Sequence, residues 1–597
     1  MSAVRDREQF GRHYGHDDLL VTALVAGVLI GAVLWAGGAL AALMSGHAVP
    51  RGRPLAGFVA LSQPATDPSV AWGTAVGPPV LYWACTVVVV TAGLLVGIVA
   101  WRLWNPAPAG AGRRRDEDPA TAPGLALRRH VRAAAGPKAL VAKAEVLRPS
   151  LAAAQPADVG VRLGSACGVE CWTCVRDSTV ILGPPGSGKG LHLVIPMVLD
   201  HPGPVITTST RPDNLAVTLA TRAERGPVAV FDPQQLAPGV PSAARWSPIR
   251  GCERPQTAMA RAAALVGDAA KGTENANFWS QQTTQAVRCL LHAAALAGRP
   301  PADLYRWSLS APAAKEAVEI LREDAGAAFA WSKALDSIIS SEPRTRDAVW
   351  AMVSNTFAAL ADPAVLDALS PAPDETFDPA QFLRSGGTVY LLGTATGASA
   401  TAGLVAALAE DVVETARRLA AASPGARLDP PLGLILDEAA NYPLPSLPAL
   451  MSEGGGSGIS TVAVLQSLAQ ARHRWGREQA EAIWDAATVK VMLGGQANAD
   501  DLADMSRLLG DVDVRESSES YSRWGDRSTS VSTRTKPILE PARLRTLPFG
   551  TGVLLLRSAP PIILELTRWI DRPDGERLVA DRTRVEETLR QAAESDP

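Results

Sequence analysis

The chain has 597 residues, which is more than a single hydrophobic core ordinarily organises, so we expect at least two structural units. Apolar residues make up 47% of the sequence, charged residues make up 20%, and the formal net charge is −3. Because the 57 Lys and Arg residues do not outnumber the 60 Asp and Glu residues, the composition excludes a protein that is basic over its whole surface. Any nucleic acid therefore has to bind a local basic region.

Two long uncharged runs near the N-terminus predict transmembrane helices. Residues 19–43 and 80–101 are almost wholly apolar, and each is long enough to cross the hydrocarbon core of a bilayer. Tyr82, Trp83 and Trp101, near the ends of the second run, are typical of the membrane interface. A cleaved signal peptide is the alternative for the first run. That run is longer than a signal sequence needs, and acidic and basic residues are mixed in the flank before it.

The distribution of basic residues predicts the orientation. Seven Arg residues follow the second run closely, whereas the loop between the runs, residues 44–79, contains only Arg51 and Arg53. By the positive-inside rule, residues 1–18 and the bulk of the chain are cytoplasmic and the loop is extracytoplasmic. The sequence therefore predicts a two-pass protein of the cell (inner or cytoplasmic) membrane.

The rest of the chain alternates short apolar runs with helical patterns, after a cytoplasmic linker that we predict at residues 102–140 from its Pro, Gly, Ala and Arg content. Strands that are buried on both faces of a parallel sheet show continuous apolar runs rather than alternation. We therefore expect an α/β fold with a mainly parallel sheet. The runs that predict its strands are Thr179–Leu182, Val205–Thr208, Val228–Phe231, Thr388–Leu392, Leu434–Leu436, Thr461–Leu465 and Val489–Leu493.

Other segments set the expected domain boundaries. Residues 255–375 have almost no strand signal and predict an inserted all-α domain, so the α/β domain comprises residues 141–254 and 376–570. Residues 571–597 predict a short charged tail. Residues 512–537 are polar and rich in Ser, and this composition predicts a flexible loop.

The strongest motif is TVILGPPGSGKG, which ends at Gly190. An apolar strand leads directly into a glycine-rich loop and a helix-compatible run follows, which is the context of a Walker A P-loop. Backbone N–H groups of such a loop turn toward phosphate oxygens, and Lys189 reaches the β- and γ-phosphates. The alternative is a glycine-rich turn that binds no nucleotide. The residues predicted to bind ATP are Gly183, Pro184, Pro185, Gly186, Ser187, Gly188, Lys189, Gly190 and Leu191.

A second motif, LGLILDE, predicts the Walker B strand. Gly190 stands where a Ser or Thr usually binds Mg²⁺, so we expect water or Asp437 to hold the metal ion. Glu438 is then placed to polarise the attacking water as a general base. Gln466 closes another apolar strand and is a candidate to sense the γ-phosphate or orient the water, or else a polar residue at a strand end. Together, Lys189, Glu438 and Gln466 are the predicted catalytic residues.

These motifs resemble those of type IV secretion coupling proteins of the TraG/TraD type. GPPGSGKGLHLVIPMVL is similar to their P-loop, in which GKG followed by Val-Ile-Pro is a familiar form. The likeness runs from about residue 140 to 560. Further similar segments, in the same order, are Phe278-Trp279, FDPAQFLRSGGTVYLLG, LILDEAANYPLPSLPAL, VAVLQSLAQ and RTKPILEPARLRTLPFGTGVLLLR.

The resemblance implies a ring-forming ATPase, a homo-oligomer expected to be a hexamer, with a RecA-like nucleotide-binding domain and an all-α domain. It implies that the protein recruits DNA or a relaxase–DNA complex and feeds it to a type IV secretion channel, although some relatives handle protein effectors. Ring motors commonly complete a neighbour's site with an arginine, and related proteins can carry it just before the strand that ends in Gln466. Here that segment is 453–458 and contains no Arg. Arg344, Arg346, Arg472 and Arg474 are all available substitutes.

Two alternative functions remain open on sequence grounds. One is a double-stranded DNA translocase of the FtsK/HerA type, although the C-terminal recognition domain of such pumps is not evident after residue 560. The other is a membrane-bound platform that binds nucleotide and substrate without processive hydrolysis, which Gly190 and the missing arginine both permit.

Three further patterns are ambiguous. Cys167, Cys171 and Cys174 have the spacing of a radical-SAM iron–sulfur site, but the sequence around them favours a cysteine-rich strand pair. Tryptophans in the helical insertion either stack on nucleotides or, more commonly, form core. The basic cluster 113–115 marks topology or contacts anionic lipid or DNA. The tryptophans concerned are Trp279, Trp307, Trp331 and Trp350.

Overall fold

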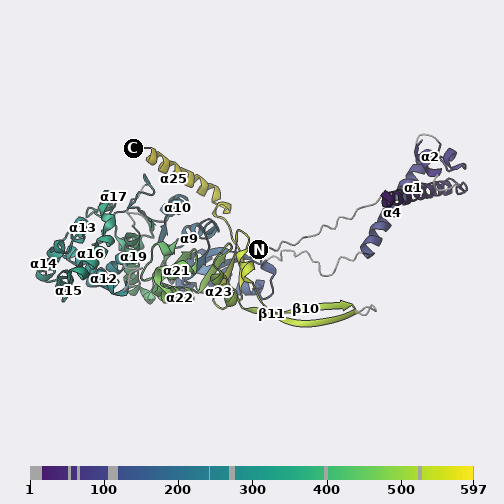
Figure 1. The fold of residues 1–597 in the computed structure, drawn as a ribbon. Coiled ribbons are helices and arrows are strands. Elements are labelled where there is room, and N and C mark those ends of the chain that lie inside the picture. Colours follow the sequence, from purple (N-terminus) through teal and green to yellow (C-terminus); the bar gives the residue numbers. More distant parts are fainter. Residues whose placement is uncertain are drawn as a thin grey trace, which may run out of the picture. The chain divides into compact units, whose positions relative to one another are not determined.

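The computed structural model forms two compact units, Met1–Asp116 and Glu117–Pro597 (Figure 1). The arginine cluster 113–115 and parts of the predicted N-terminal segment, extracytoplasmic loop and linker lie outside the described residues. The structure describes residues 16–51, 56–62, 67–104, 119–240, 243–267, 276–394, 401–521 and 527–595.

The first unit is built on two long helices, α1 (His16–Met44) and α4 (Pro79–Trp104), which form over both predicted spans. Each contains a stretch that is long and apolar enough to cross a membrane, Gly27–Met44 in α1 and Pro79–Gly97 in α4. The two helices pack closely, because a Cβ added to Gly37 would lie 2.2 Å from Oγ1 of Thr86. Two short helices, α2 (Gly57–Ser62) and α3 (Ser69–Trp72), lie between them in the chain.

An 11-stranded sheet forms the centre of the second unit, in the order β2-β1-β13-β12-β9-β3-β8-β7-β4-β6-β5. The seven strands from β9 to β5 are parallel, and each contains one of the apolar runs, so the predicted α/β fold class is confirmed. Their bounds are β3 (Thr179–Leu182), β4 (Val205–Ser209), β5 (Val228–Phe231), β6 (Thr388–Leu392), β7 (Leu432–Leu436), β8 (Ile459–Leu465) and β9 (Val489–Leu493).

Burial on both faces explains the continuous apolar runs. Val180 and Leu182 of β3 belong to one hydrophobic core, whereas Ile181 between them belongs to another. Successive side chains of a strand point to opposite faces, so these two cores lie on opposite sides of the sheet. All four residues of β3 are buried, which places the strand before the P-loop at the centre of the unit.

Four antiparallel strands extend the sheet beyond β9. They join the start of the unit, β1 (Gly160–Ala166) and β2 (Val169–Cys174), to its end, β12 (Thr551–Leu556) and β13 (Ile562–Glu565). The pairing of β1 with β2 is the strand pair that the sequence predicts around the cysteines. The strands β12 and β13 have no counterpart among the predicted runs.

The segment between β5 and β6 is helical, and the described residues of 255–375 contain no strand. Trp307 and Trp350 are buried in its core, where Nε1 of Trp350 donates to the carbonyl of Trp307 at 3.2 Å, and Trp279 and Trp331 pack against the same core. These helices lie together at one end of the unit (Figure 1). They are α11 (Pro255–Val266), α12 (Ala276–Leu296), α13 (Pro301–Ser308), α14 (Lys315–Glu323), α15 (Trp331–Ile339), α16 (Pro343–Thr356) and α17 (Pro363–Ala368).

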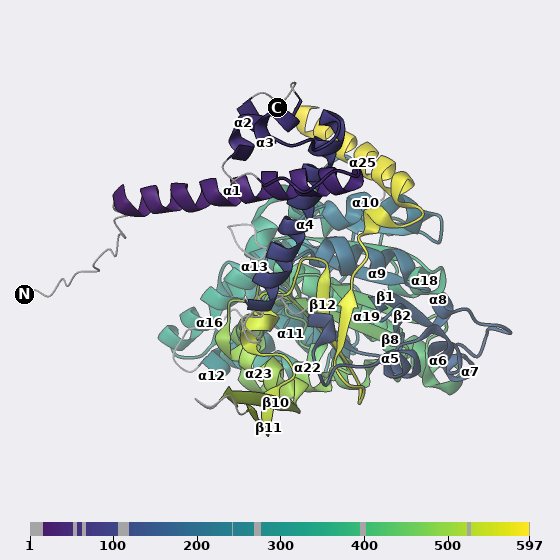
Figure 2. The same cartoon turned by 90° about the vertical axis from the view of Figure 1, so that its right-hand side faces the viewer.

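The remaining helices surround the sheet. At the two ends of the unit, the structure differs from the predicted linker and tail. Val131 of α5 is fully buried and the N–H of Ala126 donates to the carbonyl of Pro561 at 2.8 Å, so the folded unit begins well before residue 141. Residues predicted as a charged tail form α25, which lies beside α10 (Figure 2). The bounds are α5 (Arg128–Ala134), α6 (Pro137–Val141), α7 (Ala144–Leu147), α8 (Pro156–Val159), α9 (Ile195–Asp200), α10 (Asp213–Ala223), α18 (Pro379–Arg384), α19 (Ala402–Ala421), α20 (Leu447–Ala449), α21 (Leu468–Trp475), α22 (Arg477–Ala486), α23 (Ala499–Leu509), α24 (Pro541–Arg545) and α25 (Gly575–Ser595).

The prediction of a flexible loop at residues 512–537 is wrong. The described residues of this segment form a projecting antiparallel ribbon of β10 (Asp511–Tyr521) and β11 (Arg527–Pro537) (Figure 1). The backbone N–H and C=O groups of a two-stranded ribbon are paired by cross-strand hydrogen bonds, so the ribbon needs few apolar residues. Its amino-acid composition therefore resembles that of a flexible loop. The signal lies in the β-branched residues Val531, Thr533 and Thr535, which recur at the strand period of two.

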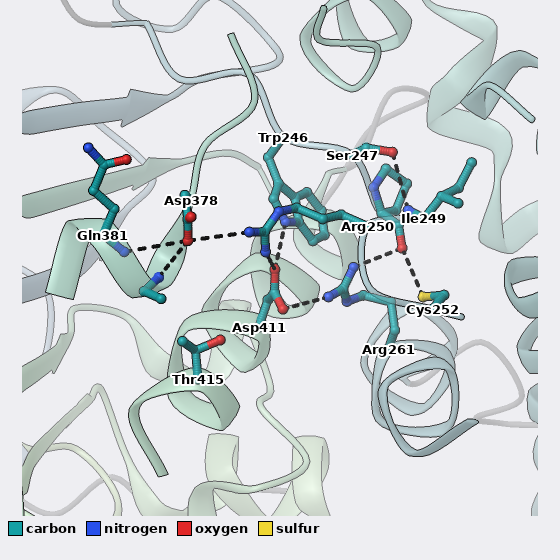
Figure 3. A network of polar contacts seen from close by, with 12 residues as sticks. Trp246, Ser247, Ile249, Arg250, Cys252, Arg261, Asp378, Gln381, Asp411 and Thr415 are labelled. Atoms are coloured by element: carbon teal, nitrogen blue, oxygen red, sulfur yellow. Dashed lines mark hydrogen bonds and ion pairs between the residues drawn. The ribbon is translucent and has the colours of Figure 1, made fainter. Parts of the chain in front are cut away.

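A buried charge network joins the helical segment to the rest of the unit (Figure 3). Asp411 of α19 accepts a hydrogen bond from Nε1 of Trp246 at 2.9 Å and pairs with Nη2 of Arg261, on α11, at 2.8 Å. The side chains of Arg261 and Asp411 are only 2% and 5% exposed. Nη1 of Arg261 donates to the carbonyl of Pro248 at 2.8 Å. The network thus fixes α11 and the 246–252 loop against α19.

Asp411→Ala is expected to lower the free energy of unfolding by about 3 kcal/mol, because it leaves the guanidinium of Arg261 buried and unpaired. Urea unfolding of the full chain in detergent measures this change. The control is Glu586→Gln, which removes an exposed pair with Arg582 on α25 and is expected to cost less than about 0.5 kcal/mol. Equal effects of the two substitutions would contradict the structural role given to Asp411.

Candidate nucleotide-binding site

The P-loop begins at the carboxyl end of β3, where the N–H of Gly183 donates to the carbonyl of Leu465 on β8 at 3.0 Å. Gly186 and Gly188 have φ angles of 77° and 85°, in the left-handed region that favours glycine. A Cβ added to Gly183 would lie 2.6 Å from Oγ of Ser187, so this position also requires glycine. The loop then enters a wide helical turn that α9 continues.

Lys189 bends back over its own loop. Its Nζ donates to the carbonyls of Gly183 at 2.6 Å and Pro184 at 3.0 Å. Burial lowers the pKa of Lys189, and the charges of Asp437 and Glu438 oppose that shift. The ammonium group is therefore held by the carbonyls of its own loop.

Asp437 follows β7 and is held by two side chains from neighbouring elements. Its carbonyl accepts from Oγ1 of Thr208 at 2.8 Å, and its Oδ2 accepts from Nδ2 of Asn214 at 3.1 Å. Burial raises the pKa of Asp437, while the hydrogen bond from Asn214 lowers it. The same Asn214 is the nearest neighbour of Gly190, since its Oδ1 lies 3.8 Å from a Cβ added there. Asn214 thus lies next to both Gly190 and the carboxylate of Asp437.

Glu438 is held in a strained and well-defined position. Its φ of 51° is unusual for a residue with a side chain, and such angles persist where the surroundings enforce them. Its Oε2 accepts from Oγ1 of Thr210 at 2.7 Å and from Nδ2 of Asn441 at 2.9 Å. Two donors on one oxygen fix the orientation of the carboxylate at the edge of the sheet.

The sheet order explains why the predicted residues meet. In the order β3-β8-β7, three parallel strands end at the same edge, and they lead into the P-loop, Gln466 and Asp437-Glu438 respectively. Gln466 is half-buried, and its N–H donates to Oε1 of Gln470 at 3.4 Å. Its position is that of a site residue, and its catalytic role stays a prediction.

The sequence reasoning missed three polar residues of the site: Thr210, Asn214 and Asn441. Thr210 and Asn214 follow β4, the strand next to β7, so polar residues after each apolar run were the available signal. Asn441 lies three residues beyond Glu438, and the helical turn there brings the two side chains together.

These residues have the polar groups that a bound nucleotide and its metal ion require. Oγ of Ser187 is buried and has no hydrogen-bond partner among the described residues. This is expected of a hydroxyl that donates a hydrogen bond to a phosphate oxygen when nucleotide is bound. The loop around it presents the N-terminus of a helix, which favours an anion. Asp437 is a carboxylate of the kind that Mg²⁺ prefers as a ligand, and at Gly190 the nearest atom to an added Cβ is 3.8 Å away.

Segment 453–458 lies before β8 and therefore at the opposite edge of the sheet from the P-loop. Nη1 of Arg427 donates to the carbonyl of Gly455 at 2.5 Å. Among the arginines suggested for completing a neighbouring site, Arg472 pairs with Asp501 at 3.5 Å and Arg346 pairs with Asp347 at 2.9 Å.

A cavity of about 800 Å³ opens at this same edge, beside Arg176 and Glu453, and no P-loop residue lines it. The P-loop, Asp437 and Glu438 thus lie outside this cavity.

Two of the three closely spaced cysteines are core residues. Cys171 and Cys174 on β2 are buried, whereas Cys167 is exposed. Burial raises the pKa of Cys171 to about 12, so its thiol stays protonated at neutral pH. Within the described ranges, no group of three or more His, Cys, Asp or Glu residues is placed to hold a metal ion.

Gly190→Ser is expected to leave the thermal stability of the full chain nearly unchanged, because the nearest atom to an added Cβ is 3.8 Å away. Gly188→Ser is the matched comparison. There the φ of 85° and a ring nitrogen of His192 at 2.6 Å both oppose a side chain, and the expected cost is about 2 kcal/mol or more. Similar melting temperatures for the two variants would contradict this description of the loop.

Comparisons with known proteins agree with the resemblance seen in the sequence. Residues 431–549, which include Asp437, Glu438 and Gln466, match the family model described as "TraM recognition site of TraD and TraG". No curated protein matches the chain.

Solved structures of the bacterial conjugative coupling protein TrwB share the fold. The unbound form of TrwBdeltaN70 aligns with a TM-score of 0.53 at 18% identity, over 68% of this chain and 88% of that one. The form in complex with sulphate aligns with 0.50 at 19% identity, over 66% and 86%. The TrwB complex with a non-hydrolysable ATP analogue aligns with 0.50 at 18% identity, over 68% and 94%. The resemblance to coupling proteins of the TraG/TraD type is thus confirmed, by the family match within residues 431–549 and by the fold of the described α/β unit.

Proposed function

We propose that this chain is a membrane-anchored ATPase of the coupling-protein kind, which recruits DNA or a relaxase–DNA complex and drives its transfer into a type IV secretion channel. The observation that carries the proposal is that the P-loop with Lys189 and the pair Asp437-Glu438 follow parallel strands that end at the same edge of the sheet. The match of residues 431–549 to TraD and TraG supports the choice of coupling protein among P-loop ATPases.

In the proposed reaction, ATP binds with its phosphates along the P-loop, and Lys189 exchanges its two carbonyl partners for phosphate oxygens. Asp437, with Asn214 behind it, would hold Mg²⁺ through water, and the ion supplies charge neutralisation at the phosphates. Water attacks the γ-phosphorus, the bond to ADP breaks, and Glu438 accepts the proton of the water. Thr210 and Asn441 keep the carboxylate of Glu438 oriented for that transfer.

The two apolar helices of the first unit provide the proposed membrane anchor. With two passes and the arginine-rich flank on the cytoplasmic side, the ATPase unit would lie at the cytoplasmic face of the cell membrane. A homo-oligomeric ring, expected to be hexameric from the resemblance, would surround the substrate there. Because segment 453–458 contains no Arg, any cation that completes a neighbour's site has to come from another element.

Lys189→Ala and Glu438→Gln are each expected to reduce DNA-stimulated ATP hydrolysis by about a hundredfold or more, since one removes a phosphate ligand and the other the general base. Glu438→Gln should still bind ATP, whereas Lys189→Ala should not. The assay uses the oligomeric full chain with DNA, and Glu586→Gln on the exposed face of α25 is the control. If the wild-type oligomer binds ATP but shows no turnover, the chain is a recruitment platform rather than a motor.

Single-stranded DNA is expected to stimulate hydrolysis more than duplex DNA of equal length, because a coupling protein exports one strand bound to a relaxase. The rates are compared on one preparation at several salt concentrations, since phosphate contacts make DNA binding salt-dependent. A clear preference for the duplex would favour the FtsK/HerA type of translocase.

A further inference from the structure

Phe549 is an exposed aromatic residue that lies against the P-loop. Its side chain is 64% exposed, which is unusual for a ring of this size just before a core strand. The ring makes an edge-on contact with His192, with 5.0 Å between the ring centroids and 68° between the planes. Cε2 of Phe549 also lies 3.0 Å from a Cβ added to Gly188. One part of the ring is therefore fixed by the loop, and the rest remains open.

The backbone around Phe549 holds it in place. The N–H of Thr551 donates to the carbonyl of Pro548 at 3.1 Å, which closes a turn with Phe549 and Gly550 at its corners. Gly550 has a φ of 81°, and its carbonyl accepts from the N–H of Leu566 at 2.8 Å. Upstream of this turn, the N–H of Gly495 donates to the carbonyl of Arg545 at 2.9 Å. The position of Phe549 is thus set on both sides of the turn.

His192 supports the ring from beneath. Its imidazole is buried, and Nδ1 lies 3.0 Å from the carbonyl of Gly188, so the side chain is anchored to the P-loop itself. Because Phe549 contacts both Gly188 and His192, its ring is positioned by the same backbone that is expected to hold the phosphates.

Strand register places Phe549 on the far side of the P-loop from the carboxylates. Leu182 aligns with Met492 of β9, and Leu493 aligns with Gly552 of β12, so the turn before β12 lies at the same sheet edge as the P-loop. The carboxylates Asp437 and Glu438 follow β7, on the other side of β3. Phe549 therefore lies on the side of the P-loop away from the carboxylates that are expected to face the γ-phosphate.

We propose that Phe549 is the platform on which the base of the bound nucleotide stacks, which rests on the function proposed above. Base–aromatic stacking is worth about 1–3 kcal/mol, corresponding to roughly a 5- to 150-fold gain in affinity, and it tolerates different bases. Phe549 therefore adds affinity for a nucleoside triphosphate over a bare polyphosphate. His192 is a positioning residue for the ring.

The test compares the affinities of the full chain in detergent for ATP and for inorganic tripolyphosphate, which has the phosphates but no base. Phe549→Ala is expected to weaken ATP binding about tenfold and to leave tripolyphosphate binding unchanged. Phe549→Trp should keep the affinity for ATP, and its indole fluorescence should respond to ATP but not to tripolyphosphate. The matched control is Phe329→Ala, which removes a 98% exposed Phe from the helical segment and should change neither affinity.

Three results would overturn the proposal. Phe549→Ala could leave ATP binding intact, or it could weaken both ligands equally, which indicates damage to the loop. It could also change only the oligomeric state, in which case Phe549 belongs to a subunit interface. In each of these cases ATP hydrolysis by the wild-type chain would leave the proposed function standing. If the wild-type chain binds neither ATP nor tripolyphosphate, the nucleotide site itself is ruled out.

Discussion

The alignment of three parallel strands at one edge of the sheet is the constraint on which the site depends. The hydrogen bond from the N–H of Gly183 to the carbonyl of Leu465 ties the P-loop to β8, and β8 in turn pairs with β7, which leads to Asp437. This arrangement brings Lys189, Asp437 and Glu438 to one edge of the sheet. Burial lowers the pKa of Lys189 and raises that of Asp437, and each charge partly offsets the cost for the other. A polyphosphate with its metal ion would extend this compensation.

The antiparallel flank explains how distant parts of the chain contribute to one edge. The strands β12 and β13 are the last strands of the sheet in chain order, yet within the sheet they lie between β9 and the N-terminal strand β1. This placement brings Phe549 next to the P-loop. It also pairs β1, at the start of the second unit, with β13, near its end. The segment that matches TraD and TraG, residues 431–549, therefore reaches from the carboxylate strand to the proposed base platform.

The helix α19 connects the site with the helical segment. Oε1 of Glu410 accepts from the N–H of Ser446 at 2.9 Å, in the stretch that follows Glu438, and the next residue, Asp411, binds Arg261 and Trp246. Both carboxylates are buried, so neither contact can be exchanged for water at low cost. One rigid helix thus contacts the loop behind the carboxylates and the all-α part of the protein.

The sequence by itself determined the seven parallel strands, the P-loop and the carboxylate pair, because each depends on a local pattern. A strand buried on both faces has to be apolar throughout, and a phosphate loop has to place glycines at positive φ. Only the tertiary structure decided which distant residues meet these groups. Asn214 is 223 residues from Asp437 in the chain, and Phe549 lies more than 350 positions after the P-loop, so only strand order brings them together. The ribbon β10–β11 was missed because cross-strand hydrogen bonds stabilise it without an apolar face.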